Sequence, residues 1–460
     1  MKVASRSFWS ILDNLVQQVL SFAIFLILAR WLTPHEFGLL AIAHLMVQFH
    51  RMSLLDALAM PVVRAPQADD RLFDWLFTIC TVVSLLVAAV MVLLAWPMAR
   101  FFDAPDLIWV LMGMSLSVVL FGLGRAHDGR LLREGNFKVM AIRSLCSVTA
   151  GGAVALWLAT RGAGAMALVA QQVVMGVVAL VVAVAAEWRH WRPRWNWSRE
   201  LLREHRGETR RIGLNACVNY ANSNGDAALV SVLLGPHATG LYNLAKRVLS
   251  AAYLVIASSL SRVGVSLFVQ RQGDPVALAQ AYRRMLGWTL LLLAPMYALV
   301  SLAAEPLVVI AFGERWRESA SLFGWLSVAY VAQAAFWLGQ NLSFATRQSA
   351  RVLKLSTVQL AVTAGLAAAL SPWGMQGIAA GVALGSVAGC VLMQLAVHRQ
   401  LSISSLSFVR STLPATLGTA SVAALLWSLP HAGIDPQRMQ NLLTSPITHS
   451  KDLLSTWQKQ

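Results

Sequence analysis

Charged residues are scarce in this 460-residue chain, and so are cysteines. Asp, Glu, Lys and Arg together make up 13% of the residues, whereas a soluble domain carries roughly 25%. The sequence has four cysteines and no C-x-x-C pair, so neither a disulfide framework nor a zinc site is indicated. It also has no GxxxxGK[ST] motif, which argues against nucleotide hydrolysis by a P-loop of this chain. We therefore expect no metal and no cofactor.

Long apolar runs take the place of the missing charge. The chain is 57% hydrophobic with a mean hydropathy of +0.61, and a bilayer span needs about 20 largely apolar residues. The sequence predicts an all-α polytopic membrane protein with twelve core spans and a weaker thirteenth at about 411–429. The twelve lie at about 8–29, 37–60, 72–95, 107–123, 139–159, 165–186, 212–234, 240–260, 285–303, 322–338, 353–370 and 377–397.

The distribution of basic residues predicts the orientation of these spans. Loops that carry most of the Lys and Arg residues face the cytoplasm. With a cytoplasmic N-terminus, the outward loops of the first twelve spans carry only five of the 37 Lys and Arg residues, namely Arg30, Arg100, Arg161, Arg315 and Arg317. The net charge of +16 therefore indicates topology rather than a surface for nucleic acid. We expect a multi-pass membrane protein with a cytoplasmic N-terminus.

One short segment occurs twice. WLTPHEFGLLAIA at 31–43 has a near copy, LLGPHATGLYNLA, at 233–245, and both contain PHxxGL at an offset of 202 residues. The copies follow the first and the seventh expected spans, so six crossings separate them and both halves have the same orientation. Parallel repeats of this kind occur in transporters whose sites lie between the two halves.

The duplication predicts four regions. Residues 1–187 form a six-helix bundle, 188–211 a basic cytoplasmic linker, 212–398 a second six-helix bundle, and 399–460 an extra helix with a polar tail. The linker alternates tryptophan with arginine. Tryptophan prefers the membrane interface and arginine the anionic leaflet, so we interpret the linker as an interfacial tether. A docking platform for a lipid pyrophosphate or a partner enzyme is the alternative.

Polar residues follow one face of the seventh span and one face of the first. Spacings of 4, 3 and 4 place four side chains of the seventh span on one helical face, namely Asn215, Asn219, Asn222 and Asp226. The first span has Asn14 and Gln17 on a similar face, with Asp13 beside it. Polar groups within spans are costly and by default mark a pathway, although amide stripes also join membrane helices.

Basic residues accompany these polar faces in the second and eighth spans. The second span has His44, Gln48 and Arg51 at spacings of 4 and 3, with Asp56 further on. The eighth has Lys246 at the position of His44, followed by Arg247. Arginine and lysine bind phosphate oxygens, and amides bind hydroxyl groups. A net-positive cavity of this kind suits an anionic cargo rich in hydroxyl groups.

The segments ARWLTPHEFGLLAIA, LLGPHATGLYNLAKRV and EPLVVIAFGERW resemble those of bacterial polysaccharide transporters. These belong to the multidrug/oligosaccharidyl-lipid/polysaccharide flippase superfamily, and the resemblance covers about residues 5–399. It implies two six-helix bundles that enclose a chamber open alternately to either side of the membrane. It also implies a location in the bacterial inner membrane and a cargo of undecaprenyl-pyrophosphate-linked oligosaccharide repeat units for O-antigen (lipopolysaccharide), capsule or exopolysaccharide assembly.

The resemblance also suggests roles for individual residues. Arg51, Lys246 and Arg247, with His44, match the basic chamber residues that engage the pyrophosphate. The amides Asn14, Gln17, Gln48, Asn215, Asn219 and Asn222 line the cavity for the sugars. From the residues themselves, Asp226 is the first candidate for ion coupling, ahead of Asp56 and Asp13, because it shares a helical face with three asparagines. Expected partners are the lipid-linked oligosaccharide, membrane lipids and a polysaccharide polymerase.

Three other functions stay open at this point. A lipid II flippase shares the architecture. A drug antiporter does too, but it requires acidic sites for cationic cargo. A membrane enzyme acting on the same glycolipid is the third, yet such enzymes present catalytic groups on a large outward loop, and the outward loops here are short. We therefore expect a transporter and not an enzyme.

Overall fold

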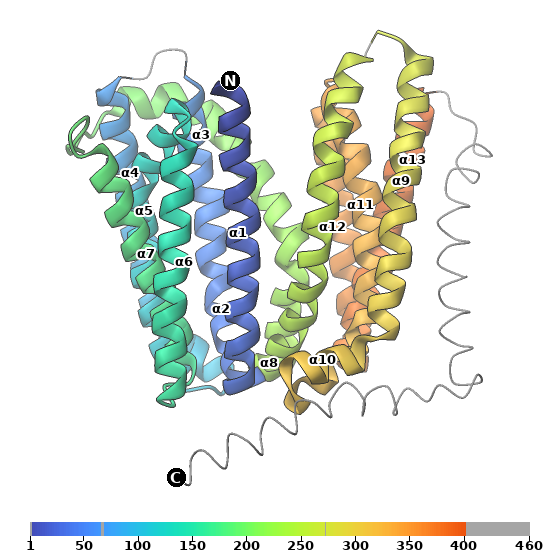
Figure 1. Cartoon of the computed structure of the whole chain (residues 1–460), viewed down its shortest axis with the longest axis horizontal. Helices are drawn as coiled ribbons and strands as arrows, with labels where there is room; N and C mark the ends of the chain where they lie inside the picture. The colour runs from blue at the N-terminus through green and yellow to red at the C-terminus, as the bar shows by residue number, and fades with distance from the viewer. Residues whose placement is uncertain (1, 66–68, 272, 402–460) are drawn as a thin grey trace. The chain divides into compact units, whose positions relative to one another are not determined.

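The computed structural model describes residues 2–65, 69–271 and 273–401, and the regular structure in these ranges is helical (Figure 1). The helices are α1 (Lys2–Trp31), α2 (Pro34–Phe49), a π-helix (His50–Leu55), α3 (Asp56–Arg64), α4 (Asp70–Phe101), α5 (Leu107–Glu134), α6 (Phe137–Thr160), α7 (Ala165–Glu187), α8 (Arg199–Gln270), α9 (Pro275–Leu302), α10 (Ala304–Phe312), a 3-10 helix (Glu314–Leu322), α11 (Phe323–Ala345), α12 (Ser349–Ala369), a 3-10 helix (Ser371–Trp373) and α13 (Gly374–Leu401).

The prediction of a helical, multi-pass membrane protein is confirmed. Nine helical stretches in the described ranges are long and apolar enough to cross a bilayer, and the twelve core spans expected from the sequence fall, to within a residue, in helical segments. The count of twelve core spans plus a thirteenth stays a prediction. The expected thirteenth span at 411–429 lies outside the described residues.

The label α8 covers two helices that join at a sharp break. Gly235 has φ 77° and ψ −175°, a conformation that essentially only glycine adopts. Pro236 follows and begins the second helix, because its fixed φ suits a first turn and its missing N–H costs no hydrogen bond there. The break separates the expected seventh and eighth spans.

The two copies of the repeated segment lie against each other. A Cβ atom added to Gly38 would lie 1.7 Å from the carbonyl oxygen of Pro236, and one added to Gly240 would lie 1.8 Å from the carbonyl oxygen of Pro34. Both glycines are buried. Each copy thus supplies a glycine that the backbone of the other copy approaches, which only a residue without a side chain permits.

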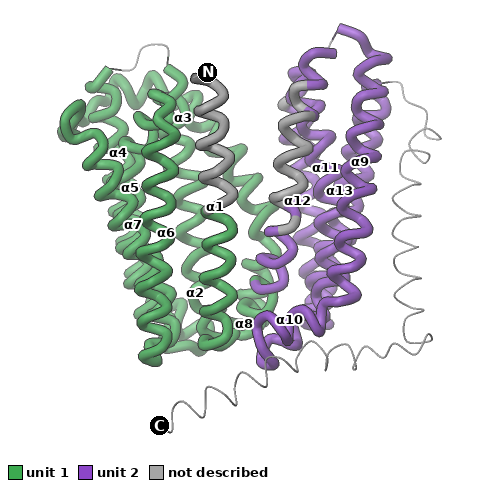
Figure 2. Tube along the Cα trace, viewed as in Figure 1, with its two compact units in different colours: residues 1–243 green, residues 244–460 purple. Residues whose placement is uncertain are grey.

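The chain divides into two compact units at Asn243 and Leu244 (Figure 2). The first half of α8 belongs to the first unit, where a Cβ on Gly213 would lie 3.4 Å from the Cβ of Ala57 and Tyr220 donates a hydrogen bond to the carbonyl oxygen of Leu45. The unit boundary differs from the division at 211/212 that the duplication predicts. That division reflects the repeat rather than compactness, and it stays a prediction.

In the first unit, α4 packs on α5, α5 on α7, α7 on α6, and α6 on α1 (Figure 1). One apolar cluster joins α2, α4, α5 and α7 around Val47, Met91 and Leu111. A second joins α3, α4 and α5 around Leu55 and Leu76, and it includes Trp191 of the linker. The linker is therefore anchored in the core of the first unit.

In the second unit, α11 packs on α9 and α13, and α13 packs on α12. The seam between α12 and α13 depends on four glycines spaced four residues apart: Gly377, Gly381, Gly385 and Gly389. A Cβ on Gly381 or Gly385 would lie 2.5 Å from the Cα of Ala367 or Thr363, respectively. Small residues at this spacing allow two membrane helices to pack backbone against backbone.

Candidate functional site

The predicted cation Arg51 lies in the π-helix that follows α2. Its guanidinium carbon is 4.4 Å from the ring centroid of Phe121 on α5, and the residue is exposed. π-helical turns often occur at functional sites. Since Arg51 forms no ion pair with a described residue, its charge is available to a ligand.

The predicted carboxylate Asp56 forms an ion pair at the end of the same π-helix. Its Oδ1 lies 2.8 Å from Nη2 of Arg125 on α5. Sequence reasoning did not identify Arg125 as a site residue. Because Asp56 neutralises Arg125, Arg51 supplies the net positive charge of this cluster.

The polar face predicted on the first half of α8 includes two side chains bound to their own helix. Nδ2 of Asn215 donates to the carbonyl oxygen of Arg211, and Nδ2 of Asn222 donates to that of Val218. Asn215 and Asn219 are exposed. Bonds of this kind engage the amide nitrogens within the helix, and the amide oxygen of the exposed Asn215 can accept from a hydroxyl group.

Asp226 continues this face toward the break in α8. Its Oδ2 accepts a hydrogen bond of 2.8 Å from the hydroxyl of Tyr242, and its Oδ1 accepts one of 2.8 Å from the backbone N–H of Ala227. Tyr242 lies beyond Gly235, so this pair bridges the two helices of α8. These two hydrogen bonds fix the orientation of the carboxylate.

The remaining predicted site residues lie on α1, on α2 and on the second helix of α8. Gln17 on α1, and His44 and Gln48 on α2, are half-buried. Lys246 and Arg247 lie in the second unit, where the carbonyl oxygen of Lys246 accepts a hydrogen bond of 3.2 Å from Tyr330, and Arg247 is exposed. The side chains of Asp13 and Asn14 lie outside the described residues. The roles assigned to all of these residues stay predictions.

An apolar hollow of about 570 Å³ lies in the first unit, against the side of α8 that faces away from Asn215, Asn219 and Asp226. Its lining includes Met46, Phe49, Val87, Tyr220 and Asn224. The rings of Phe49 and Tyr220 meet edge to face at 5.6 Å. The hollow could accommodate an apolar chain within a few residues of Arg51.

Sequence reasoning missed a buried pair formed by His127 on α5 and Glu187 at the end of α7. Nδ1 of His127 lies 2.7 Å from Oε2 of Glu187, and both side chains are almost fully buried. Sequence reasoning had no signal for the pair, because the two residues are 60 positions apart in the chain. The pair ties the last turn of α7 to α5. In the described ranges, no group of three or more His, Cys, Asp or Glu residues could hold a metal.

Comparison with known proteins identifies the family. The profile of a family described as polysaccharide biosynthesis protein matches residues 27–321, more than half of the chain. This chain belongs to the polysaccharide biosynthesis protein family. The matched region contains both copies of the repeated segment and the π-helix, so it includes most of the predicted site.

One relative of this polysaccharide biosynthesis protein carries a transport name. The succinoglycan biosynthesis transport protein ExoT of Rhizobium meliloti (strain 1021) is 29% identical over 322 residues, which is 70% of this chain and 65% of that protein. The match thus spans less than two thirds of the length of that relative.

Solved structures confirm the expected fold. The inward closed form of the lipid II flippase MurJ has a TM-score of 0.70 at 13% identity, covering 91% of this chain and 98% of that one. An inward-facing multidrug transporter of the MATE family has a TM-score of 0.62 at 16% identity, covering 85% and 98%. At such identities these likenesses concern the fold alone.

Proposed function

We propose that this protein is a flippase for undecaprenyl-pyrophosphate-linked oligosaccharide repeat units. It moves them from the cytoplasmic to the periplasmic leaflet of the bacterial inner membrane for exopolysaccharide, capsule or O-antigen assembly. The observation that carries the proposal is that a polysaccharide biosynthesis family member has the fold of a lipid-linked cargo flippase. The transport name of ExoT supports it.

Arg51 is the residue we propose to bind the pyrophosphate in the first unit. It is exposed within a membrane span, and the face of Phe121 orients its guanidinium. A guanidinium binds phosphate oxygens through paired hydrogen bonds. Lys246 and Arg247 play the same part in the second unit, and His44 assists in the first. The amides of α1, α2 and α8 accept and donate hydrogen bonds to the sugars, while the lipid tail stays in the bilayer.

Asp226 is the residue we propose for ion coupling. Its carboxylate is bound by Tyr242 across the break in α8, so a change in its protonation or ion occupancy would alter the contact between the two helices. Asp56 is a weaker choice because Arg125 already neutralises it. Asp226→Asn should abolish the dependence of transport on the ion gradient, and transport by the variant with its ion dependence intact would contradict this role.

The proposed orientation has a cytoplasmic N-terminus and a cytoplasmic linker. It follows from the basic residues, which are concentrated on one side of the expected spans. We also propose that the chain itself performs no bond-making chemistry and delivers its cargo to a separate polymerase. A lipid II flippase, a drug antiporter and a membrane enzyme are the alternatives that the experiment must separate.

The test measures which leaflet holds the repeat units in a deletion strain of the host. Undecaprenyl-linked oligosaccharides should accumulate whole on the cytoplasmic face, protected from a membrane-impermeant glycosidase, and the surface polysaccharide should be lost. Repeat units that still reach the periplasm unpolymerised would indicate an enzyme instead. Loss of peptidoglycan precursors from the periplasm, with surface polysaccharide intact, would indicate a lipid II flippase.

Matched variants then test the site. Arg51→Gln removes the exposed guanidinium and should lower delivery of repeat units about tenfold, since a hydrogen bond to a charged group contributes about 1.5–3 kcal/mol. Arg100→Gln is the control, because Arg100 also stacks on an aromatic ring, at 5.1 Å from Trp96, at the end of α4. Equal effects of the two substitutions would contradict a specific role for Arg51.

A further inference from the structure

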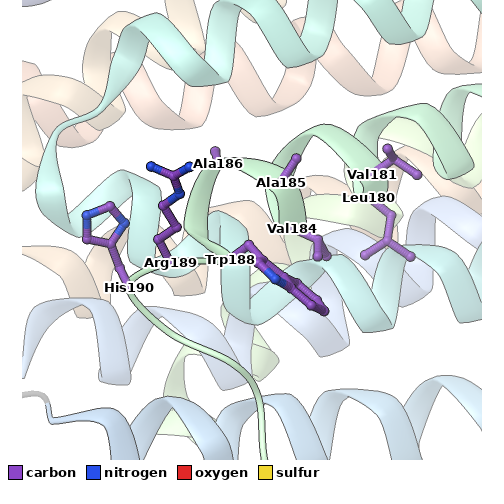
Figure 3. A pocket seen from close by; sticks show the side chains of 8 residues that line it. All are labelled: Leu180, Val181, Val184, Ala185, Ala186, Trp188, Arg189 and His190. Carbon is purple, nitrogen blue, oxygen red and sulfur yellow. The ribbon is translucent and has the colours of Figure 1, made fainter.

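A hollow of about 650 Å³ lies beside the C-terminal end of α7, within the first unit (Figure 3). Its wall is apolar and consists of the last two turns of the helix, including Leu180, Val181 and Val184. Its rim is formed by the three residues that follow the helix: Trp188, Arg189 and His190. In Figure 3, Arg189 and His190 lie at the opposite end of the hollow from Leu180 and Val181.

The wall is suited to a hydrocarbon chain. Val181 is 59% exposed and Trp188 is 53% exposed, at the end of a helix that is long and apolar enough to span a bilayer. Tryptophan prefers the level of the lipid headgroups. An occupant of this hollow therefore has its apolar part beside α7 and its polar part at Arg189.

The rim is positively charged. Arg189 is exposed and forms no ion pair with a described residue. The guanidinium carbon of Arg192 lies 4.7 Å from the ring centroid of Trp188, and its Nε donates a 3.4 Å hydrogen bond to the carbonyl oxygen of Trp188. One guanidinium thus stacks on the exposed indole and another follows it in the chain, and their charge is complementary to that of a phosphate.

Hydrogen bonds to α4 hold the rim in place. Nε1 of Trp191 and the backbone N–H of Arg194 both donate to Oδ1 of Asp74, each at 3.0 Å. On the other side, the buried contact between Glu187 and His127 fixes the last turn of α7. The segment that carries Arg189 and Arg192 is therefore pinned at both ends, and a site held in this way loses less conformational entropy when a ligand binds.

We propose that this hollow binds an anionic diacyl phospholipid of the surrounding membrane. One acyl chain lies along Leu180, Val181 and Val184, and the phosphate is held by Arg189 and Arg192, with the imidazole of His190 within reach of the headgroup. The charge complementarity of the rim and the position of the wall at a bilayer surface favour this occupant. The site does not depend on the cargo and would be present in any transport state that keeps the linker on α4.

The test measures phospholipid binding to the delipidated full-length protein by native mass spectrometry. Phosphatidylglycerol, phosphatidylcholine and bare undecaprenyl pyrophosphate are added separately and in competition. Phosphatidylglycerol should bind in preference to phosphatidylcholine. Each arginine near an anionic lipid contributes about 1 kcal/mol, so Arg189→Gln with Arg192→Gln should weaken phosphatidylglycerol binding by roughly thirtyfold.

A matched pair of variants controls for bulk charge. Arg199→Gln with Arg203→Gln removes the same charge from exposed positions that do not line the hollow, and it should leave the affinity within twofold or so of the wild type. Ala185→Trp fills the wall without changing charge and should also weaken binding.

Three results would overturn the proposal. If both double arginine variants lost phosphatidylglycerol affinity equally, the lipid would be attracted by the diffuse charge of the surface and not by the hollow. Equal affinities for phosphatidylglycerol and phosphatidylcholine would show that the positive charge of the rim does not select the lipid. Displacement of phosphatidylglycerol by undecaprenyl pyrophosphate at equal concentration would make the hollow a cargo site instead. Surface polysaccharide production in the same strains reports separately on the proposed function.

Discussion

The two copies of the repeated segment make the same contact but begin their helices differently. In the first copy, Thr33 caps α2: its hydroxyl accepts a 3.3 Å hydrogen bond from the N–H of Glu36, and Oε2 of Glu36 accepts one of 2.7 Å from the N–H of Thr33. In the second copy the equivalent positions are Gly235 and Ala238, and the chain turns through a positive φ instead.

The difference shows which residues of the repeat are constrained by the contact between the copies. Pro34 and Gly38 match Pro236 and Gly240, and these four residues form the reciprocal approach of backbone to backbone. The first copy begins its helix with a side-chain cap and the second with a glycine at positive φ, so the start of the helix differs while the contact is the same. The shared proline and glycine therefore follow the contact between the copies rather than the way each helix begins.

The largest effect should come from filling either glycine of the contact. Gly38→Ala and Gly240→Ala would each place a carbon within 2 Å of a proline carbonyl oxygen, which a fixed backbone cannot accommodate. We expect each to lower the free energy of unfolding by about 3 kcal/mol or more, seen as a lower thermal unfolding midpoint in detergent and a lower yield of monodisperse protein.

Two other helical glycines provide the control for this pair. A Cβ on Gly324 or Gly365 would meet no described atom within 4 Å, so alanine there should be neutral or stabilise by up to about 1 kcal/mol. If Gly38→Ala or Gly240→Ala behaves like Gly365→Ala, the two copies are not in contact in the way described.

The break at Gly235 should give the next largest effect. Its φ of 77° and ψ of −175° cost a residue with a side chain about 1–3 kcal/mol, although a Cβ there meets no described atom within 4 Å. Gly235→Thr, which imports the residue of the first copy, should therefore destabilise the protein in chemical denaturation. An unchanged denaturation curve would mean that the second copy turns by another route.

A smaller effect is expected at Thr33, where φ is −89° and any residue fits. Thr33→Ala removes the capping hydrogen bond and should cost about 1 kcal/mol, whereas Thr33→Gly should cost only about a few tenths. If Thr33→Gly has little effect on stability while Gly235→Thr destabilises the protein, the two copies begin their helices in different ways. If both substitutions have little effect, the two starts are equivalent.

The smallest effect is expected at His35 and His237, which the copies share by sequence. Neither imidazole makes a hydrogen bond or ion pair with a described residue. His35→Gln and His237→Gln should each change the unfolding midpoint by the equivalent of no more than about 0.5 kcal/mol. A large loss at either position, or a loss that depends on added metal, would show that the histidines have a role beyond the turn.

Much of the fold could be predicted from the sequence because membrane spans are local features. Each run of apolar residues must satisfy its own backbone hydrogen bonds, so a helix follows from composition alone. The break in α8 was also predicted, since Gly235 and Pro236 interrupt an apolar run. The boundary between the compact units was not, because it depends on which helices the first half of α8 packs against.

The candidate site was predicted only in part, and for a related reason. Helical periodicity shows that Asn215, Asn219, Asn222 and Asp226 share a face, but it cannot show what a side chain contacts on another helix. The ion pair of Asp56 with Arg125 and the buried pair of His127 with Glu187 both join helices distant in sequence. The π-helix that carries Arg51 adds one residue to a turn, which shifts any face assigned by counting.

The glycine seam between α12 and α13 has a consequence for inheritance. Glycine is the one residue without a Cβ, so every missense mutation in the codons of Gly377, Gly381, Gly385 and Gly389 adds a carbon that would lie within 3 Å of an atom of α12 or of the turn after it. Conservative exchange is not available at these four sites. In a population of variants selected for surface polysaccharide, this short stretch should be among the poorest in surviving alleles, although it contains none of the predicted cargo-binding residues.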